Sequence, residues 1–298
     1  MCRLFGFRSV IPSQVHRSLL AAENALGVQS NLHPDGWGVA FYVEGSPHVT
    51  RSPLTALGDS LFHRLSGVVA SQTVLAHVRR ATRGDKTVFN CHPFQYGRWV
   101  FAHNGDITGF ESVRETLLAE VAPNLRRFIL GDTDSEVVFF IFLSLLAKFG
   151  SLGADPELDA AMAALRSTVL RVREIADSAG DAVASTLTLM ATNGETLVAT
   201  QGGKELFLST YKRRCADRDT CASLSAACEA PSTGKVNHLV LSSEPLLGEN
   251  VWVPLSEGDI IGVDASMQPR RAHLERISLP QVPLPPVARA ASEEPGVA

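Results

Sequence analysis

A cysteine directly follows the initiator methionine, in the run Met1-Cys2-Arg3-Leu4-Phe5-Gly6. Cysteine is small enough for the methionine to be removed, so we expect a mature chain that begins with Cys2. That residue would then carry a thiol, with an ordinary pKa of about 8.5, and a free α-amine, with an ordinary pKa of about 7.7–8.0. Because the amine can accept the thiol proton near neutral pH, Cys2 is a candidate nucleophile. A buried cysteine at the start of a first strand is the alternative.

A cysteine that attacks an amide needs hydrogen-bond donors for the developing oxyanion, and His103-Asn104-Gly105-Asp106 offers two of them. The run follows an expected strand, so the Asn104 side-chain amide and the Gly105 backbone N–H can converge on one oxygen. Such a donor typically lowers the barrier by about 2.7–4 kcal/mol. Asn-Gly is also a common turn dipeptide, so a simple turn is the alternative.

Two further charged positions suit an amino-acid ligand. Arg79, followed by Arg80 and Arg83, comes just after a buried-looking strand. A guanidinium can hold a carboxylate through two parallel hydrogen bonds, although a solvated basic loop would show the same pattern. Asp134 precedes a long apolar run, where its carboxylate would suit a substrate ammonium group or would simply cap a helix.

The remaining motifs favour structural roles. The glycines of Asp35-Gly36-Trp37-Gly38 predict close backbone approach or a bulge. His77, His92 and His103 are interpreted as packed or hydrogen-bonded residues beside the site. No glycine-rich phosphate loop or zinc-type histidine pair occurs. Cys215, Cys221 and Cys228 lie six and seven residues apart, without a Cys-x-x-Cys pair, which favours an ordinary loop over a metal site. We therefore expect neither a cofactor nor a metal.

The elements that would position these residues form three groups. The first third predicts short strands at residues 4–7, 37–42, 74–78 and 99–102, and a helix capped by Ser13 that runs to about Leu26. The middle predicts one helix after Asp134 through residue 149 and another from residue 155 to about 179. Asn193-Gly194 predicts a hairpin between strands 187–191 and 196–200. Further strands are expected at 236–242, 251–254 and 259–263.

Strands, then helices, then strands indicate an α+β fold with two sheets and helices packed outside them. After Ser278 the chain contains five prolines and few residues able to build a core. We therefore expect one domain over residues 1–278 and a Pro-rich disordered tail over 279–298.

Composition excludes several classes of protein. The 298 residues are 45% hydrophobic and 19% charged, which suffices for a sizeable core, and the net charge of −4 argues against a nucleic-acid surface. The longest apolar stretch, 137–147, is too short to span a bilayer, and no signal peptide is recognisable. The odd cysteine count speaks against a disulfide framework. A cytoplasmic protein without nucleic-acid or membrane partners is expected.

Taken together, the motifs resemble the class II glutamine amidotransferases, which are N-terminal-nucleophile hydrolases. The resemblance is strong over residues 1–140 and extends to about 278. It implies a four-layer α/β/β/α sandwich of two stacked, mainly antiparallel sheets. The matching pieces, in the family's order, are Met1-Cys2, Asp35-Gly36-Trp37-Gly38, His77-Val78-Arg79 with Ala81-Thr82, Asn90 with His92-Pro93-Phe94, His103-Asn104-Gly105 and Thr133-Asp134-Ser135-Glu136.

The resemblance also implies a reaction and a set of roles. Glutamine would be hydrolysed through a γ-glutamyl thioester, releasing ammonia and glutamate. Cys2 would be the nucleophile with its own amine as the base. The other implied roles are the oxyanion hole for Asn104 and Gly105, the glutamine α-carboxylate site for Arg79, the α-amino site for Asp134 and the substrate-site lining for Thr82.

The sequence departs from the synthases of this family, which carry a further domain that consumes the ammonia. The bulky aromatic residue and the histidine often found in the arginine-containing loop are replaced by Arg80 and Arg83. The chain is more similar to the standalone YafJ-type branch, which implies a separate synthase subunit as the ammonia acceptor. Two alternatives stay open: a γ-glutamyl hydrolase acting on a larger amide, and a catalytically silent regulatory subunit.

Overall fold

Two antiparallel sheets form the centre of the computed structural model, which describes residues 2–15, 17–22, 24–177, 183–211, 234–248, 250–276, 278–284 and 287. The strands of the first sheet are, in spatial order, β11 (Val253–Pro254), β9 (Phe207–Ser209), β10 (His238–Ser242), β1 (Arg3–Gln14), β4 (Ala70–Val78), β2 (Trp37–Val43) and β3 (Ser46–Ser52). Those of the second sheet are β13 (Arg270–His273), β12 (Asp259–Val263), β8 (Leu197–Thr200), β7 (Thr186–Thr192), β6 (Trp99–Asp106) and β5 (Phe94–Tyr96).

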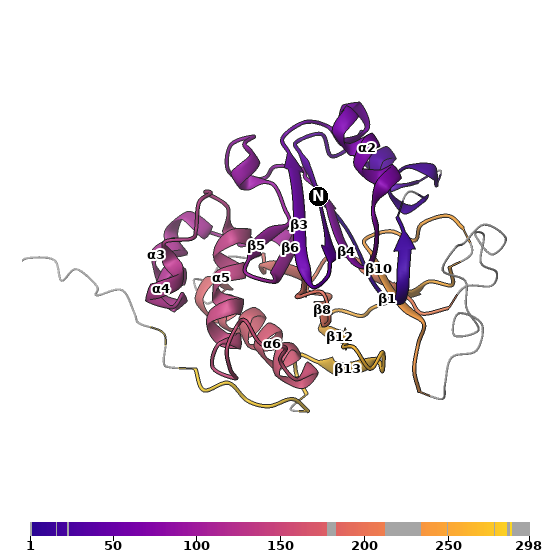
Figure 1. Ribbon diagram of the computed structural model, residues 1–298. Coiled ribbons are helices and arrows are strands. Elements are labelled where there is room, and N and C mark those ends of the chain that lie inside the picture. The colour runs from indigo at the N-terminus through magenta and orange to yellow at the C-terminus, as the bar shows by residue number, and fades with distance from the viewer. Residues whose placement is uncertain are drawn as a thin grey trace, which may run out of the picture.

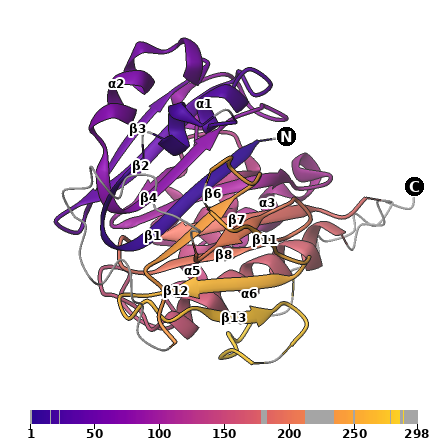
Figure 2. The ribbon, with the colours of Figure 1, turned by 90° about the vertical axis from the view of Figure 1, so that its right-hand side faces the viewer.

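Helices cover the outer face of each sheet (Figures 1 and 2). A π-helical turn at Arg17–Ala21, α1 (Leu26–Gln29) and α2 (Ser60–Val68) lie over the first sheet. Over the second sheet lie α3 (Phe110–Glu120), α4 (Pro123–Arg126), α5 (Asp134–Leu146) and α6 (Leu158–Ala176). The result is the expected four-layer α/β/β/α sandwich.

Successive side chains along a strand point to opposite faces of the sheet, so the core is divided into layers. On β1, Leu4 is buried between the two sheets, whereas Phe5 packs on the outer face with α1 and α2. On β6, Val100 faces the first sheet and Phe101 packs against α5. Because neighbouring side chains of a strand point to opposite faces, one apolar strand can supply two cores. This explains why the strands of the site read as nearly continuous apolar runs.

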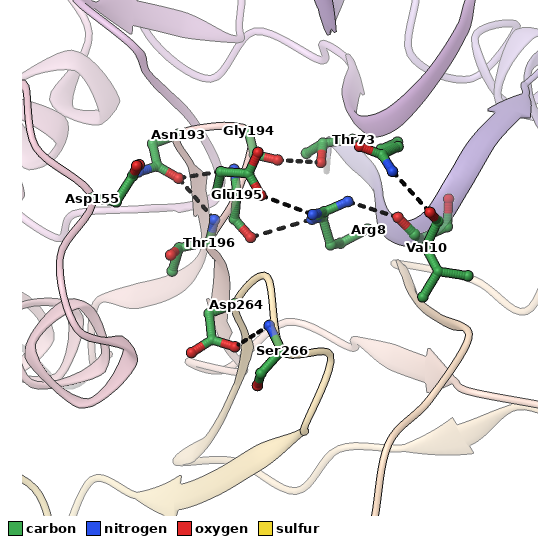
Figure 3. Close-up of polar contacts among 12 residues, drawn as sticks. Arg8, Val10, Thr73, Asp155, Asn193, Gly194, Glu195, Thr196, Asp264 and Ser266 are labelled. Carbon is green, nitrogen blue, oxygen red and sulfur yellow. Dashed lines mark hydrogen bonds and ion pairs between the residues drawn. The ribbon is translucent and has the colours of Figure 1, made fainter. Parts of the chain in front are cut away.

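Figure 3 shows how the turn between β7 and β8 connects the sheets. The Asn193 side chain accepts the Thr196 backbone N–H at 2.8 Å and so shapes the turn. The Thr73 hydroxyl of β4 donates to the Gly194 carbonyl at 2.6 Å, and Arg8 of β1 pairs with Glu195 at 2.9 Å. The expected Asn-Gly hairpin is confirmed, and its turn ties the second sheet to the two central strands of the first.

Most expected elements are present, and two expectations differ from the structure. The predicted helix from Ser13 to about Leu26 is wrong. β1 continues to Gln14, because Ser13 and Gln14 still pair with Ser71 and Ala70 of β4; a π-helical turn follows at Arg17–Ala21, and α1 begins at Leu26. In the expected disordered segment, Leu279 and Val282 are buried against the helical layer of the second sheet. Residues 279–284 therefore pack where disorder is predicted, and most of 285–298 lies outside the described residues.

No helix in the described part of the chain is long and apolar enough to cross a membrane. The apolar run after Asp134 forms α5 instead, and every residue of this helix is buried.

We expect Arg171→Met to lower the free energy of unfolding by about 3 kcal/mol, because Arg171 forms an ion pair with the mostly buried carboxylate of Glu120. Its guanidinium, 1% exposed, pairs with Glu120 at 2.6 Å and with Glu174 at 2.9 Å. The substitution would leave the Glu120 carboxylate, 15% exposed, without its cation. Chemical denaturation measures the change. The double variant Arg171→Met/Glu120→Gln should recover part of the loss, and equal stability of the two variants would contradict this account.

Candidate active site

Cys2 lies at the edge of a cavity, immediately before β1. Arg3 pairs with Val78 at the end of β4, so the residue before Arg3 lies beside the segment that follows β4. The Cys2 Sγ is 3.3 Å from the backbone nitrogen of Arg80, which donates to it, and 3.4 Å from the Arg80 carbonyl oxygen. Burial raises the pKa of the Cys2 thiol, while the Arg80 backbone N–H and the positive charge of Arg79 act in the opposite direction.

The loop after β4 is held by the glycine-rich motif at the start of β2. The Arg79 backbone N–H donates to the Gly36 carbonyl at 2.7 Å. The Asp35 carboxylate accepts the Ala81 N–H at 2.9 Å and pairs with Lys86 at 2.5 Å. The loop is therefore fixed at the backbone next to Cys2, which positions the N–H that contacts the sulfur.

Gly38 confirms that a glycine of this motif permits close backbone approach. A Cβ at this position would overlap the His92 carbonyl oxygen.

Asn104 and Gly105 come from β6, in the sheet opposite the one that begins after Cys2. Asn104 is 2% exposed; its Nδ2 is 3.5 Å from the Ser243 hydroxyl, and its Oδ1 accepts no hydrogen bond from the described residues. At Gly105, a Cβ would overlap the carbonyl oxygen of Thr186 on the neighbouring strand β7. Only glycine fits there, so packing alone requires Gly105.

The cavity has a volume of about 250 Å³ and is lined by residues next to both sheets, among them Cys2 and Asn104. Small-molecule pockets typically enclose about 300–1,000 Å³, so this one suits a ligand of amino-acid size. Four of the residues expected at the site, Cys2, Thr82, Asn104 and Gly105, line it. The full lining is Cys2, Arg80, Thr82, Arg83, Asn104, Gly105, Asp106 and Lys204.

Arg79 and Asp134, the other two expected residues, are buried and do not line the cavity. The Nη1 of Arg79 donates to the Asp85 carbonyl at 3.0 Å, and its Nη2 donates to the carbonyls of Arg83 and Gly84 at 2.6 and 3.2 Å. Three of the five N–H donors of the guanidinium thus hold the loop. Both charges act on Cys2, because Arg79 lowers the pKa of its thiol and Asp134 raises it.

Asp134 is the first residue of α5, and the helix cap is its neighbour Thr133, whose hydroxyl accepts the Glu136 N–H at 3.4 Å. The Asp134 carboxylate accepts the Ile107 N–H at 2.9 Å and the Ser135 N–H at 2.7 Å. It therefore links the end of β6 to the start of α5. Capping does not account for this carboxylate.

The three histidines near the site are buried and do not line the cavity. His103 contacts the Ser135 hydroxyl and the Thr186 carbonyl, both at 2.9 Å. The rings of His77 and His92 lie 4.2 Å apart. Burial lowers the pKa of His77 to about 3 and that of His92 well below its ordinary value, so both stay neutral. These contacts support a packing role.

Two residues of the site carried no recognisable signal in the sequence. Lys204 reaches the cavity from the segment after β8, and Ser243, which follows β10, contacts Asn104. The Ser243 hydroxyl also accepts the Leu4 N–H at 3.0 Å and so joins the start of β1 to the Asn104 side chain.

Among the residues that the structure describes, no group of three or more His, Cys, Asp and Glu side chains is placed to hold a metal. Cys215, Cys221 and Cys228 lie outside those residues.

Comparison with known families gives a match over most of the chain. The sequence model of the family described as "Glutamine amidotransferases class-II" matches residues 1–272.

Three curated relatives match over shorter stretches. The probable glutamine amidotransferase DUG3 of Saccharomyces cerevisiae is 31% identical over 57% of this chain and 53% of its own length. The putative glutamine amidotransferase YafJ of Escherichia coli is 31% identical over 50% of this chain and 56% of its own length. The γ-glutamyl-hercynylcysteine sulfoxide hydrolase of Mycobacterium tuberculosis is 37% identical over 35% of this chain and 49% of its own length. The chain thus spans about half the length of these relatives.

Solved structures share the fold at low sequence identity. A glutamine aminotransferase class-II domain protein from Silicibacter pomeroyi superposes with a TM-score of 0.62 at 21% identity, covering 91% of this chain and 99% of its own. The glutamine phosphoribosylpyrophosphate amidotransferase of Bacillus subtilis superposes with a TM-score of 0.56 at 13% identity, covering 93% of this chain and 50% of its own.

Proposed function

Because this chain belongs to the class II glutamine amidotransferases, we propose that it hydrolyses the side-chain amide of glutamine through a thioester on Cys2. The observation that supports this most is the convergence of Cys2, Asn104 and Gly105 on one cavity of amino-acid size. The nucleophile and the two oxyanion donors come from different sheets about a hundred residues apart. Amide hydrolysis requires the nucleophile and the donors to lie side by side, whereas neither β1 nor β6 needs this contact in order to fold.

The reaction begins when Met1 has been removed and the Cys2 α-amine takes the thiol proton. The sulfur then bonds to the amide carbon, and the Asn104 amide and the Gly105 N–H bind the resulting oxyanion. The carbon–nitrogen bond breaks as the Cys2 ammonium gives its proton to the departing ammonia. Water finally attacks the thioester, which releases glutamate and restores the thiol.

The α-carboxylate and α-ammonium groups of the substrate are assigned to the two buried charges, Arg79 and Asp134. Arg79 would bind the α-carboxylate with the N–H donors that the loop carbonyls leave free. Asp134 would bind the α-ammonium group, and Thr82 would contact the side chain of the substrate from the cavity wall. A fixed pair of opposite charges selects for a zwitterionic end group.

A second candidate reaction differs only in the leaving group. One relative is named as a hydrolase of a γ-glutamyl compound, and the same nucleophile and oxyanion donors would cleave a substituted amide. Ammonia release from free glutamine supports the first reaction. Activity confined to substituted γ-glutamyl amides supports the second.

Intact-protein mass spectrometry combined with a glutaminase assay tests the proposal. The expected mass lacks Met1, and the expected activity is equimolar ammonia and glutamate. Protein that has lost Met1 but hydrolyses neither glutamine nor any γ-glutamyl amide would refute it. The fuller proposal, a cytoplasmic amidotransferase domain over residues 1–278 that passes ammonia to a separate synthase, is tested by whether a co-purifying protein consumes the ammonia.

We expect Arg79→Ala to raise KM for glutamine about tenfold to a hundredfold, since hydrogen bonds to charged groups contribute about 1.5–3 kcal/mol. Steady-state kinetics across glutamine concentrations measure the effect. Arg79→Lys keeps the positive charge and loses the planar fork, so it should show a smaller rise in KM. A fall in kcat alone, with KM unchanged, would mean that Arg79 does not hold the ground-state substrate.

A further inference from the structure

The cavity lining carries an excess of positive charge. Arg80, Arg83 and Lys204 are cationic, and Asp106 is the anionic member. Arg83 is already paired, because its Nε donates to the Asp106 carboxylate at 3.0 Å. Neither Arg80 nor Lys204 forms an ion pair within the described ranges of the chain. Two cationic side chains therefore remain at the cavity without a counter-charge.

Lys204 is held in place by a specific turn. Thr188 of β7 pairs with Asn104 of β6, and the Thr188 hydroxyl accepts the backbone N–H of Gly202 and of Lys204 at 3.1 and 3.0 Å. The same hydroxyl donates to the Lys204 carbonyl at 2.8 Å. Gly203 has a φ of +106°, which side chains rarely adopt. The backbone thus fixes the lysine one strand away from the oxyanion donor.

Arg80 lies beside the nucleophile. Its backbone contacts the Cys2 sulfur, while its side chain is exposed. Arg79 and Asp134, assigned to the glutamyl end, are buried. Arg80 and the half-buried Lys204 therefore lie nearer to solvent, where the part of a substrate beyond the scissile amide must extend.

We propose that the same site also hydrolyses γ-glutamyl amides whose leaving amine carries an anionic group, as in a γ-glutamyl amino acid, and that Arg80 and Lys204 bind that group. A carboxylate there would form charge-assisted hydrogen bonds with both cations. Ammonia from glutamine has no group that could reach them. The inference rests on the proposed hydrolysis: the sulfur–carbon bond forms, the carbon–nitrogen bond breaks, and the amino acid leaves with the proton that ammonia would otherwise take.

Two matched substrates isolate the charge. γ-Glutamylglycine and γ-glutamylglycinamide share the scissile bond and differ in the terminal carboxylate or amide. We expect wild-type kcat/KM to favour γ-glutamylglycine by about tenfold, the low end for a hydrogen bond to a charged group. Lys204→Gln and Arg80→Gln should each reduce this ratio, and the double variant should bring it close to one. Equal kcat/KM for the two substrates in the wild type, or a full preference in the double variant, would overturn the inference.

Lys235→Gln is the matched control, because it removes the same charge from an exposed lysine. Lys235 precedes β10 at the end that pairs with Ser9, whereas the site lies at the end that pairs with Phe5. The control should retain the tenfold preference, and its loss would show that net charge rather than position sets the ratio.

Binding to the Cys2→Ala variant separates this inference from the proposed reaction. Calorimetry should show tighter binding of γ-glutamylglycine than of γ-glutamylglycinamide. If the wild type hydrolyses neither glutamine nor any γ-glutamyl amide, the proposed function fails. If it hydrolyses glutamine and no substituted γ-glutamyl amide, this inference fails and the proposed function stands. If it does hydrolyse them and Cys2→Ala binds both compounds equally, the charge assignment alone is overturned.

Discussion

Cys2→Ala is expected to lower kcat for glutamine hydrolysis by about 10³-fold or more, because it removes the sulfur that bonds to the amide carbon. The cavity offers no second thiol among its lining residues, and the backbone N–H of Arg80 would be left facing a methyl group. Glutamate release, followed by mass spectrometry, measures the rate. A wild-type rate in this variant would exclude Cys2 as the nucleophile.

The fold should survive this substitution. Cys2 is half-buried and precedes the first strand, and the hydrogen bonds of its thiol are with the backbone of one residue, Arg80. We expect the free energy of unfolding to change by less than about 1 kcal/mol, as for substitutions outside the core. Cys91→Ser is the matched control: this buried thiol donates to the carbonyls of Ser52 and Thr87, which a hydroxyl can also do. The control should keep activity within a few-fold of the wild type.

The local parts of the site could be predicted from the sequence, because each depends on a short motif. Asn-Gly after the expected strand 99–102 indicates two donors near a strand end. The structure shows that β6 continues to Asp106 and that Gly105 has no room for a side chain. Thr82, which the family resemblance implies, shares its loop with Arg79. In each case the chemistry and the backbone geometry are set within a few residues.

The non-local parts could not be predicted in this way. Lys204 reaches the cavity only because Thr188 pairs with Asn104 and then holds the turn after β8. Ser243 reaches Asn104 because β10 pairs with β1. Neither residue belongs to a motif, and strand register between segments far apart in the sequence decides both positions. The extension of β1 beyond Ser13 has the same origin, since pairing with β4 overrides the local helix signal.

The position of Arg79 shows a limit of reading roles from motifs. Its sequence context suggests a carboxylate ligand, and the structure shows its guanidinium also holding the loop carbonyls of residues 83–85. A single side chain can thus order the loop beside Cys2 and present its remaining donors to substrate. For this reason a kcat effect and a KM effect must be measured separately in Arg79 variants.

Asn104→Ala is expected to lower kcat by about 10²–10³-fold, the usual loss when one oxyanion donor is removed. Among the described residues, the Nδ2 of Asn104 makes only a long contact of 3.5 Å with the Ser243 hydroxyl, so the amide is available to a ligand oxygen. KM should change little, because the donor acts on an oxyanion that forms only in the transition state. Steady-state kinetics on glutamine separate the two parameters.

Ser243→Ala distinguishes the donor from the residue that positions it. This variant keeps the Asn104 amide and removes the hydroxyl beside it, so its kcat should fall by less than that of Asn104→Ala. In the double variant the Ser243 effect should largely disappear, because a positioning group has no function once its donor is gone. Additive losses would show that Ser243 acts on substrate independently. A rise in KM without a fall in kcat for Asn104→Ala would place Asn104 in substrate binding, and the oxyanion assignment would then be wrong.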